Sequence, residues 1–183
     1  MIYFTSDMHF GHKNILELSN RPFSSIEEMD EELIRRYNSV VHAKDTVYDL
    51  GDFTFKEPQS YLRRLKGNHI RLKGNHDYDI SEPYMMVIKP ENLRDEYGNH
   101  IPITLCHFAM RSWYNSHYGS WHLYGHHHGL FEPHGMSFDV GVDNWDYYPI
   151  SLDEVIKKME TLNPIVDFRK QRRIDHEMRK EKK

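Results

Sequence analysis

The sequence predicts an α/β domain built in layers with mixed sheets, and three observations lead to this prediction. Short β-rich runs alternate with amphipathic helical segments in the first half of the chain, whereas strands dominate the second half. The length of 183 residues suits one domain, which at this size buries roughly 70% of its unfolded surface. No fold-scale repeat or low-complexity segment divides the chain. We therefore predict one domain over residues 1–163 and a basic tail over residues 164–183.

Strands are expected where a short apolar run stops at a glycine or a turn. These runs are residues 2–6, 46–50, 69–72, 84–88, 101–106, 122–124 and 137–142, with a turn at 95–99 before the fifth run. Helices are expected at residues 12–18, 25–41, 58–65 and 151–162. The second and fourth helices begin with capping-box spacing, Ser25 with Glu28 and Ser151 with Glu154. The second also has an apolar stripe that predicts core packing, formed by Ile26, Met29, Leu33, Ile34, Tyr37 and Val41.

Two near-copies of one tetrapeptide, residues 66–69 and 73–76, are given different roles. The first follows a predicted helix, where Gly67-Asn68 is expected as a C-terminal cap with a left-handed residue. The second follows a strand-like alternation, so it should present its side chains at a strand end. We assign structure to the first copy and chemistry to the second.

Charge and composition narrow the class of protein. The formal charge is -4, but the tail from Arg169 onward carries +5, which leaves -9 on the rest of the chain. An acidic body suits a protein that collects divalent cations, while the tail could touch nucleic acid or form a solvated terminal helix. The single cysteine, Cys106, excludes an internal disulfide and a thiolate-rich zinc site. No apolar run approaches a membrane span, and Asp7 comes too early for a signal peptide. We therefore expect a cytoplasmic protein without an evident obligate protein partner.

Five segments share one design, an apolar strand that ends in side chains able to bind a metal. The candidate ligands at these strand ends are Asp7, His9, Asp52, Asn75, His107, His126 and His128. Ligand sites in α/β sheets gather at the carboxyl ends of strands, so these residues are expected to meet. Oxygen and imidazole donors without sulfur suit Mn, Fe, Co, Ni or Zn. Seven ligands exceed the need of one tetrahedral zinc, and they suffice for two metals if one carboxylate bridges.

Each of these residues also has an ordinary interpretation when it is taken alone. Asp7 could cap a helix, Gly51-Asp52 could be a plain turn, and His107 could be a core histidine with its hydrogen bonds satisfied. The histidine run 126–128 could be a surface tract that binds metal adventitiously. The occurrence of all five segments at strand ends favours the metal site.

The order Asp-x-His, Gly-Asp, Gly-Asn-His-Asp, His, Gly-His-x-His resembles the calcineurin-like metallophosphoesterase family, from Asp7 to His128. The resemblance implies a four-layer α/β/β/α sandwich with two mixed sheets and a dinuclear metal centre, most commonly Mn. The ligands it implies are Asp7, His9 and His128 for one metal, and Asn75, His107 and His126 for the other, with Asp52 bridging. His127 should not be a ligand. The chain looks most like the small bacterial or phage-type members.

A dinuclear centre implies phosphoester hydrolysis. Two cations stabilise the attacking and leaving oxygens of an in-line displacement, and a water between them becomes a hydroxide nucleophile near neutral pH. The resemblance identifies His76 as the catalytic histidine, and we assign it as the general acid for the leaving oxygen. Substrate contacts are assigned to Arg111, whose guanidinium matches a phosphate, and to His117; a surface salt bridge is the alternative for Arg111. Aromatic residues of the same segment could stack on a base or form a packed lid: Trp113, Tyr114, Tyr118 and Trp121.

The substrate is open to several interpretations. The predicted activity is hydrolysis of phosphodiesters, phosphomonoesters or both. Alternatives are a nuclease, a cyclic-nucleotide phosphodiesterase, or a metal-binding module without catalysis. Protein phosphatases of the family continue Gly-Asp with Asp-Arg-Gly, whereas this chain continues with Phe53-Thr54-Phe55. That departure argues against phosphoprotein substrates and leaves the carboxylate that would orient His76 unidentified.

Overall fold

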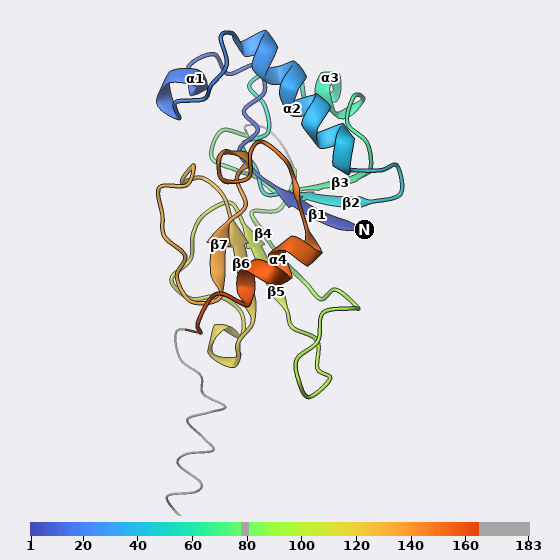
Figure 1. Cartoon of the computed structure of the whole chain (residues 1–183), viewed down its shortest axis with the longest axis vertical. Helices are drawn as coiled ribbons and strands as arrows, with labels where there is room; N and C mark the ends of the chain where they lie inside the picture. Colours follow the sequence, from blue (N-terminus) through green and yellow to red (C-terminus); the bar gives the residue numbers. More distant parts are fainter. Residues whose placement is uncertain (78–80, 165–183) are drawn as a thin grey trace, which may run out of the picture.

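The protein was described from a computed structural model, which covers residues 1–77 and 81–164. Its first sheet has the strand order β3-β2-β1-β8 (Figure 1). The strands are β1 (Ile2–Thr5), β2 (Thr46–Asp49), β3 (Asn68–Arg71) and β8 (Ile150–Ser151). β1, β2 and β3 run parallel, and β8 is antiparallel to β1. The carboxyl ends of three strands therefore lie at one edge of this sheet.

The second sheet has the order β4-β5-β6-β7 and is also mixed. Its strands are β4 (Met85–Ile88), β5 (Ile103–Cys106), β6 (Trp121–Tyr124) and β7 (Ser137–Asp139). β5, β6 and β7 are parallel, and β4 is antiparallel to β5. The predicted fold class, an α/β/β/α sandwich with two mixed sheets, is confirmed.

Figure 1 shows α2 lying across the first sheet, while α4 follows β8 and contacts β8 and β1 of the same sheet. The helices are α1 (Ile15–Leu18), α2 (Ile26–Val40), α3 (Pro58–Leu62) and α4 (Leu152–Met159), together with the 3₁₀ helices η1 (Ser116–Tyr118) and η2 (Val142–Asn144). Within the described ranges, no helix is long and apolar enough to span a membrane.

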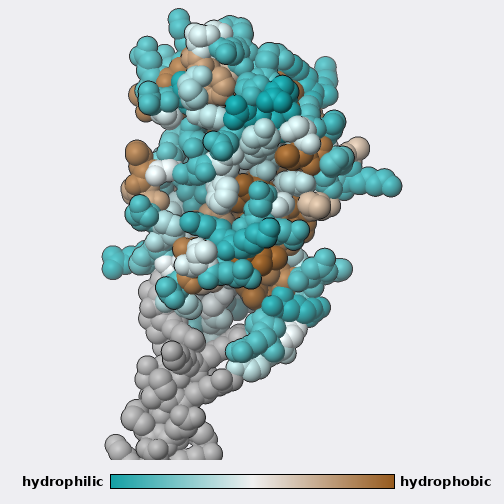
Figure 2. All heavy atoms as spheres, in the orientation of Figure 1, coloured by the Kyte–Doolittle hydropathy of each residue, from teal (hydrophilic) through white to brown (hydrophobic). Residues whose placement is uncertain are grey.

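Two hydrophobic cores follow from the alternation of side chains along β1. Tyr3 joins the core under α2, where the predicted stripe is buried. Phe4 faces the other way and joins the core between the sheets, with Leu105 of β5 and Leu123 of β6. The surface in Figure 2 is mainly hydrophilic, with hydrophobic residues in small separate areas. The sheets are thus held by apolar packing, while their strand ends remain open for polar side chains.

The boundaries of several elements differ from the prediction. The segment expected as a helix at 12–18 forms only the single turn of α1, and α4 ends at Met159 rather than at 162. The strand expected at 137–142 ends at Asp139, because its carboxylate accepts a hydrogen bond from the backbone N–H of Gly141 (2.7 Å) and turns the chain. Gly67 is left-handed as predicted (φ 95°), but Asn68 already begins β3 instead of capping a helix.

Both predicted helix caps are present, but only one is a complete capping box. At α4, Ser151 and Glu154 exchange both hydrogen bonds. At α2, the hydroxyl of Ser25 accepts from the backbone of Glu28, whereas the Glu28 carboxylate accepts from Ser24. At α2, therefore, the Glu28 carboxylate binds the backbone N–H of Ser24, one residue before the N-cap, instead of that of Ser25.

One buried histidine ties the segment after β5 to the outer face of the second sheet. His122 of β6 donates from Nδ1 to the carbonyl of Thr104 (3.0 Å) and accepts from the backbone N–H of Met110 at Nε2 (3.1 Å). Its ring lies 5.3 Å from the buried Trp113. Two such bonds require the neutral imidazole, and burial lowers the pKa of His122 to about 4.

We expect this histidine to make folding stability depend on pH. Between pH 6.5 and pH 4 the unfolded imidazole takes up a proton that the folded one rejects, so stability falls by about 2 to 3 kcal/mol. Urea unfolding in the presence of EDTA measures the free energy of unfolding of wild type and of His122→Gln. The difference between these two free energies should shrink by that amount as the pH falls. A difference that stays constant from pH 7 to pH 4.5 would contradict this assignment.

Candidate metal centre

The structure brings the seven predicted ligands together at the carboxyl ends of five strands. They lie directly after β1, β2, β3, β5 and β6 in the chain, where parallel strands end at a common edge. Six of them form two groups, and within each group the ligand atoms lie within 4.8 Å of one another. The first group is Asp7, His9 and His128, and the second is Asp52, His107 and His126. Asn75 belongs beside the second group, because its Oδ1 lies 2.9 Å from Nε2 of His107.

Asp52 lies between the two groups. Its Oδ2 is 3.7 Å from Nε2 of His9 in the first group and 3.3 Å from Nε2 of His107 in the second. The Leu50 carbonyl can only accept, so Nδ1 of His107 is the donor of the 3.1 Å bond between them, and Nε2 faces Asp52 and Asn75 in the site. A carboxylate in this position can serve both groups at once.

The first group contains buried polar atoms that lack a protein partner. Within the described residues, Asp7 Oδ1 and His9 Nε2 make no hydrogen bond, although the two side chains are 0% and 2% exposed. These atoms are 3.8 Å apart, and Nε2 of His128 lies 3.9 Å from the same Asp7 oxygen. Leaving such atoms unpaired is costly, so the donor set fits a cation between them.

The backbone at the site is strained. Five of the seven predicted ligands have positive φ angles, between 47° and 72°: Asp7, His9, Asp52, His126 and His128. Each residue in this conformation costs about 1 to 3 kcal/mol, and such strain gathers at functional sites. The strain arises from close packing, since a Cβ on Gly51 would lie 2.3 Å from the backbone nitrogen of Gly74.

Burial also sets the protonation of the first group. It lowers the pKa of His9 to about 3, so the imidazole is neutral and can act as a ligand. Burial raises the pKa of Asp7 to about 6, against the opposing effect of His107 and His128. A divalent cation would restore the carboxylate form, because an opposite charge favours the ionised group.

A buried ion pair orients His128. Its Nδ1 donates to Oδ2 of Asp143 (2.7 Å), and Asp143 accepts two further bonds from the guanidinium of Arg21, each 2.8 Å long. Arg21 also donates to the backbone carbonyl of Asp7 (2.7 Å). Burial alone would raise the pKa of Asp143, but its bonds with His128 and Arg21 more than offset this and hold it below its ordinary value. The pair therefore fixes which nitrogen of His128 faces the metal site.

Asp77 organises the backbone around the bridging position. Its carboxylate accepts from the N–H groups of Asp52 (2.7 Å), Gly74 (2.9 Å) and Phe53 (3.2 Å). The Gly-Asn-His-Asp segment thus contributes a structural carboxylate in addition to its ligand. Sequence reasoning identified this segment but gave Asp77 no role.

His76 lies at the edge of the site. Its backbone N–H donates to Oδ1 of Asp52 (2.8 Å), and its half-buried ring lies 5.7 Å from that of His9 and 5.1 Å from that of Phe55. Among residues 1–77 and 81–164, no carboxylate is hydrogen-bonded to this ring. The role of His76 as general acid stays a prediction.

The remaining predicted residues lie in or beside the segment 108–120. Arg111 and His117 are exposed, and their assignment to substrate binding stays a prediction. Of the aromatic residues, Trp113 and Trp121 are buried, as in a packed lid, while Tyr114 and Tyr118 are exposed. His127 is half-buried and stacks on Phe131, with ring centroids 3.6 Å apart.

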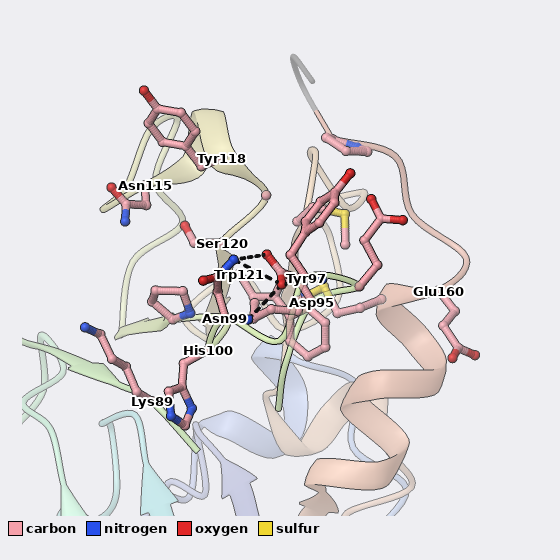
Figure 3. Close-up of a pocket in the computed structure, with 17 residues that line it drawn as sticks. Lys89, Asp95, Tyr97, Asn99, His100, Asn115, Tyr118, Ser120, Trp121 and Glu160 are labelled. Carbon is pink, nitrogen blue, oxygen red and sulfur yellow. Dashed lines mark hydrogen bonds between the residues drawn. The ribbon is translucent and has the colours of Figure 1, made fainter. Parts of the chain in front are cut away.

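A hollow of about 740 Å³ lies at the opposite ends of the second-sheet strands (Figure 3). Its walls include Pro102 before β5, Trp121 at the start of β6 and Met136 before β7. The figure also shows Asn99 bonded to Asp95 within it. The hollow contains none of the predicted metal ligands, nor His76, Arg111 or His117, so its size does not make it the candidate active site.

Comparisons with known proteins support a shared family. The chain is 36% identical over 171 residues to the uncharacterized protein MJ1445 of Methanocaldococcus jannaschii, covering 87% of this chain and 91% of that protein. It is 27% identical to the Gene 66 protein of Mycobacterium phage L5, covering 84% of this chain and 91% of that protein. No family model matches the sequence.

A solved structure is similar in fold. A protein of unknown function from Aquifex aeolicus, AQ665, is similar with a TM-score of 0.64 and 26% identity, over 86% of this chain and 98% of that one. A predicted phosphoesterase from Streptococcus pneumoniae and a Vps29 variant from Entamoeba histolytica are each 20% identical over 76% of this chain, covering 70% and 72% of their own chains. Their TM-scores of 0.38 and 0.45 are too low to support an inference.

Loss of the Asp143 carboxylate should weaken metal binding. In Asp143→Asn the buried Arg21 loses its counter-charge and His128 loses its strongest acceptor, so we expect metal affinity to fall about 10- to 100-fold. Titration calorimetry with Mn²⁺ measures the change. Asp146→Asn, an exposed aspartate three residues away, is the matched control and should bind as wild type does. Equal affinity in both variants would show that the ion pair does not position the ligand.

Proposed function

We propose that this chain, which shares a family with MJ1445, is a calcineurin-like metallophosphoesterase that hydrolyses phosphoesters with the help of two divalent cations. The observation that carries the proposal is the pair of ligand groups joined by Asp52. In the first group, Asp7 Oδ1 and His9 Nε2 are buried and have no hydrogen-bond partner in the described part of the chain. Mn²⁺ is the proposed metal, with Fe, Co, Ni and Zn as alternatives, because the donors are carboxylate, amide and imidazole.

The proposed ligands divide between the two cations. Asp7, His9 and His128 would hold one, Asn75, His107 and His126 would hold the other, and Asp52 would contact both. When bound, the cations supply positive charge for the phosphoryl oxygens and lower the pKa of a water molecule. Asn75 contributes a neutral oxygen, which limits the negative charge that an incoming phosphate must face.

The protein itself supplies positioning and a proton. His76 lies beside the site, since its backbone N–H donates to Asp52 and its ring lies 5.7 Å from that of His9. We assign it to give a proton to the oxygen that leaves phosphorus. The water oxygen forms the new bond to phosphorus, the bond to the leaving oxygen breaks, and no redox partner is needed. Arg111 and His117 are proposed to contact the substrate from the segment after β5.

Metal dependence is the first test. Chelation should abolish hydrolysis of bis-p-nitrophenyl phosphate and p-nitrophenyl phosphate, and Mn²⁺ should restore it. Asp52→Asn should lower kcat/KM about 100-fold or more, since several kcal/mol of charge stabilisation depend on the shared carboxylate. Elemental analysis should show reduced metal content in this variant but normal content in Asp153→Asn, a control on the exposed face of α4. Turnover that persists without metal would refute the mechanism, and metal uptake without turnover of any ester would favour a silent binding module.

The role of His76 has its own test. His76→Ala keeps the backbone bond to Asp52, so metal content should be unchanged while kcat falls on the order of 10²–10⁴-fold. The loss should be larger for alkyl esters than for p-nitrophenyl esters, because a p-nitrophenolate leaves without a proton. The control is His127→Ala, which removes a histidine that lies between two predicted ligands but is not itself one. It should change kcat little. Loss of metal in His76→Ala would show that this histidine has a structural role instead.

A further inference from the structure

Two exposed aromatic rings stand on either side of the candidate metal centre. Phe55 is 43% exposed, and its ring lies 5.7 Å from that of His9 and 5.1 Å from that of His76. Phe108 is 40% exposed, and its ring lies 5.1 Å from that of His107 and 4.8 Å from that of His126. One ring therefore borders the first ligand group and the other borders the second.

The positions of these rings matter more than their exposure. A single exposed phenylalanine on a protein surface is ordinary. Here each ring contacts histidines of a different ligand group, and each is held in place by neighbours; Phe55 stacks on His12 with centroids 3.9 Å apart. A phosphodiester bound at the centre must direct its two substituents away from phosphorus in different directions, because the four oxygens surround phosphorus tetrahedrally. Each ring borders a different ligand group, so each can lie beside a different substituent.

Resting on the proposed function, we infer that the substrate is a phosphodiester between two flat aromatic groups, as between neighbouring nucleosides of a single strand. Phe55 stacks on the group that leaves, because it borders the proposed proton donor His76, and Phe108 stacks on the group that stays. Nucleobases stack on aromatic side chains without regard to base identity, and a duplex would hide their faces. The inference makes Phe55 and Phe108 specificity-determining residues.

A matched pair of substrates isolates the stacking contact at Phe55. One is a deoxydinucleotide with adenine on both sugars, and the other has an abasic sugar on the leaving side, which product analysis identifies. With wild type and Mn²⁺, kcat/KM should be about 10-fold higher for the complete dinucleotide. Phe55→Leu, which retains an apolar side chain but no ring, should turn over both substrates at the rate that wild type shows for the abasic one.

Two further variants test which ring is responsible for the preference on each side of the phosphate. Phe108→Leu should lose the preference for a base on the other sugar and keep the preference on the leaving side. Tyr118→Leu removes an exposed ring that lines the hollow away from the centre, and it should behave as wild type does. If Tyr118→Leu abolished the preference while Phe55→Leu kept it, the stacking residues would be wrongly assigned.

A binding measurement separates this inference from catalysis. Calorimetry with a dinucleotide whose bridging oxygen is replaced by methylene should give a Kd about 10-fold weaker for Phe55→Leu than for wild type. A protein that hydrolyses bis-p-nitrophenyl phosphate but treats the two dinucleotides alike would overturn the stacking inference and leave the proposed function standing. A protein that hydrolyses no ester with any of the metals would overturn the proposed function, and equal Kd values in that protein would overturn the stacking as well.

Discussion

The close approach of strand ends, both within the first sheet and between the two sheets, is the constraint on which the candidate site depends. Gly51 after β2 lies against Gly74 after β3, and Gly125 after β6 lies against Ser6 after β1, where a Cβ would be 2.1 Å from the serine hydroxyl. Only residues without side chains permit this spacing. Asp52 and His126, which follow Gly51 and Gly125, have the left-handed conformation and lie in the second ligand group. The apolar core between the sheets provides the force that keeps the strand ends close.

Charge balance is the second constraint. The carboxylates at this edge are buried, and two buried arginines serve as their resident counter-charges. Arg21 pairs with Asp143, while Arg71 lies 3.9 Å from Asp49 and 3.6 Å from Asp77. Among residues 1–77 and 81–164, Asp7 and Asp52 have no arginine partner for their carboxylates, and these are the two carboxylates at the ligand groups. Bound cations would neutralise the two carboxylates that the arginines leave unpaired. This agrees with the negative formal charge of the chain outside its basic tail.

Local sequence patterns were enough to predict the fold class and the set of residues that meets at the strand ends. Strand ends are recognisable because an apolar run stops at glycine, and metal ligands are recognisable by their type. Arg21 and Asp143 were beyond such reasoning, because they are 122 residues apart and only the folded chain brings them together. The function of Asp77 was also missed, since its position in the motif does not reveal that its side chain points back to the backbone of Asp52.

Helix and strand ends shifted where tertiary hydrogen bonds, such as that of Asp139, overrode local preference. The predicted basic tail from residue 164 lies, apart from Pro164, outside the described residues.

The strands of the second sheet have two ends with very different freedom. At the carboxyl end, glycines leave no room for a Cβ, the backbone is left-handed at several ligands and charged groups are buried. We therefore expect substitutions there to be poorly tolerated. The hollow at the other end is separated from this machinery by a strand of four residues, or about 13 Å, and by a packed apolar core. Side chains such as Lys89 and Tyr118 line this hollow, away from the ligand groups. This opposite face can therefore vary in shape and charge, as a surface for new associations, without altering the geometry of the ligand groups.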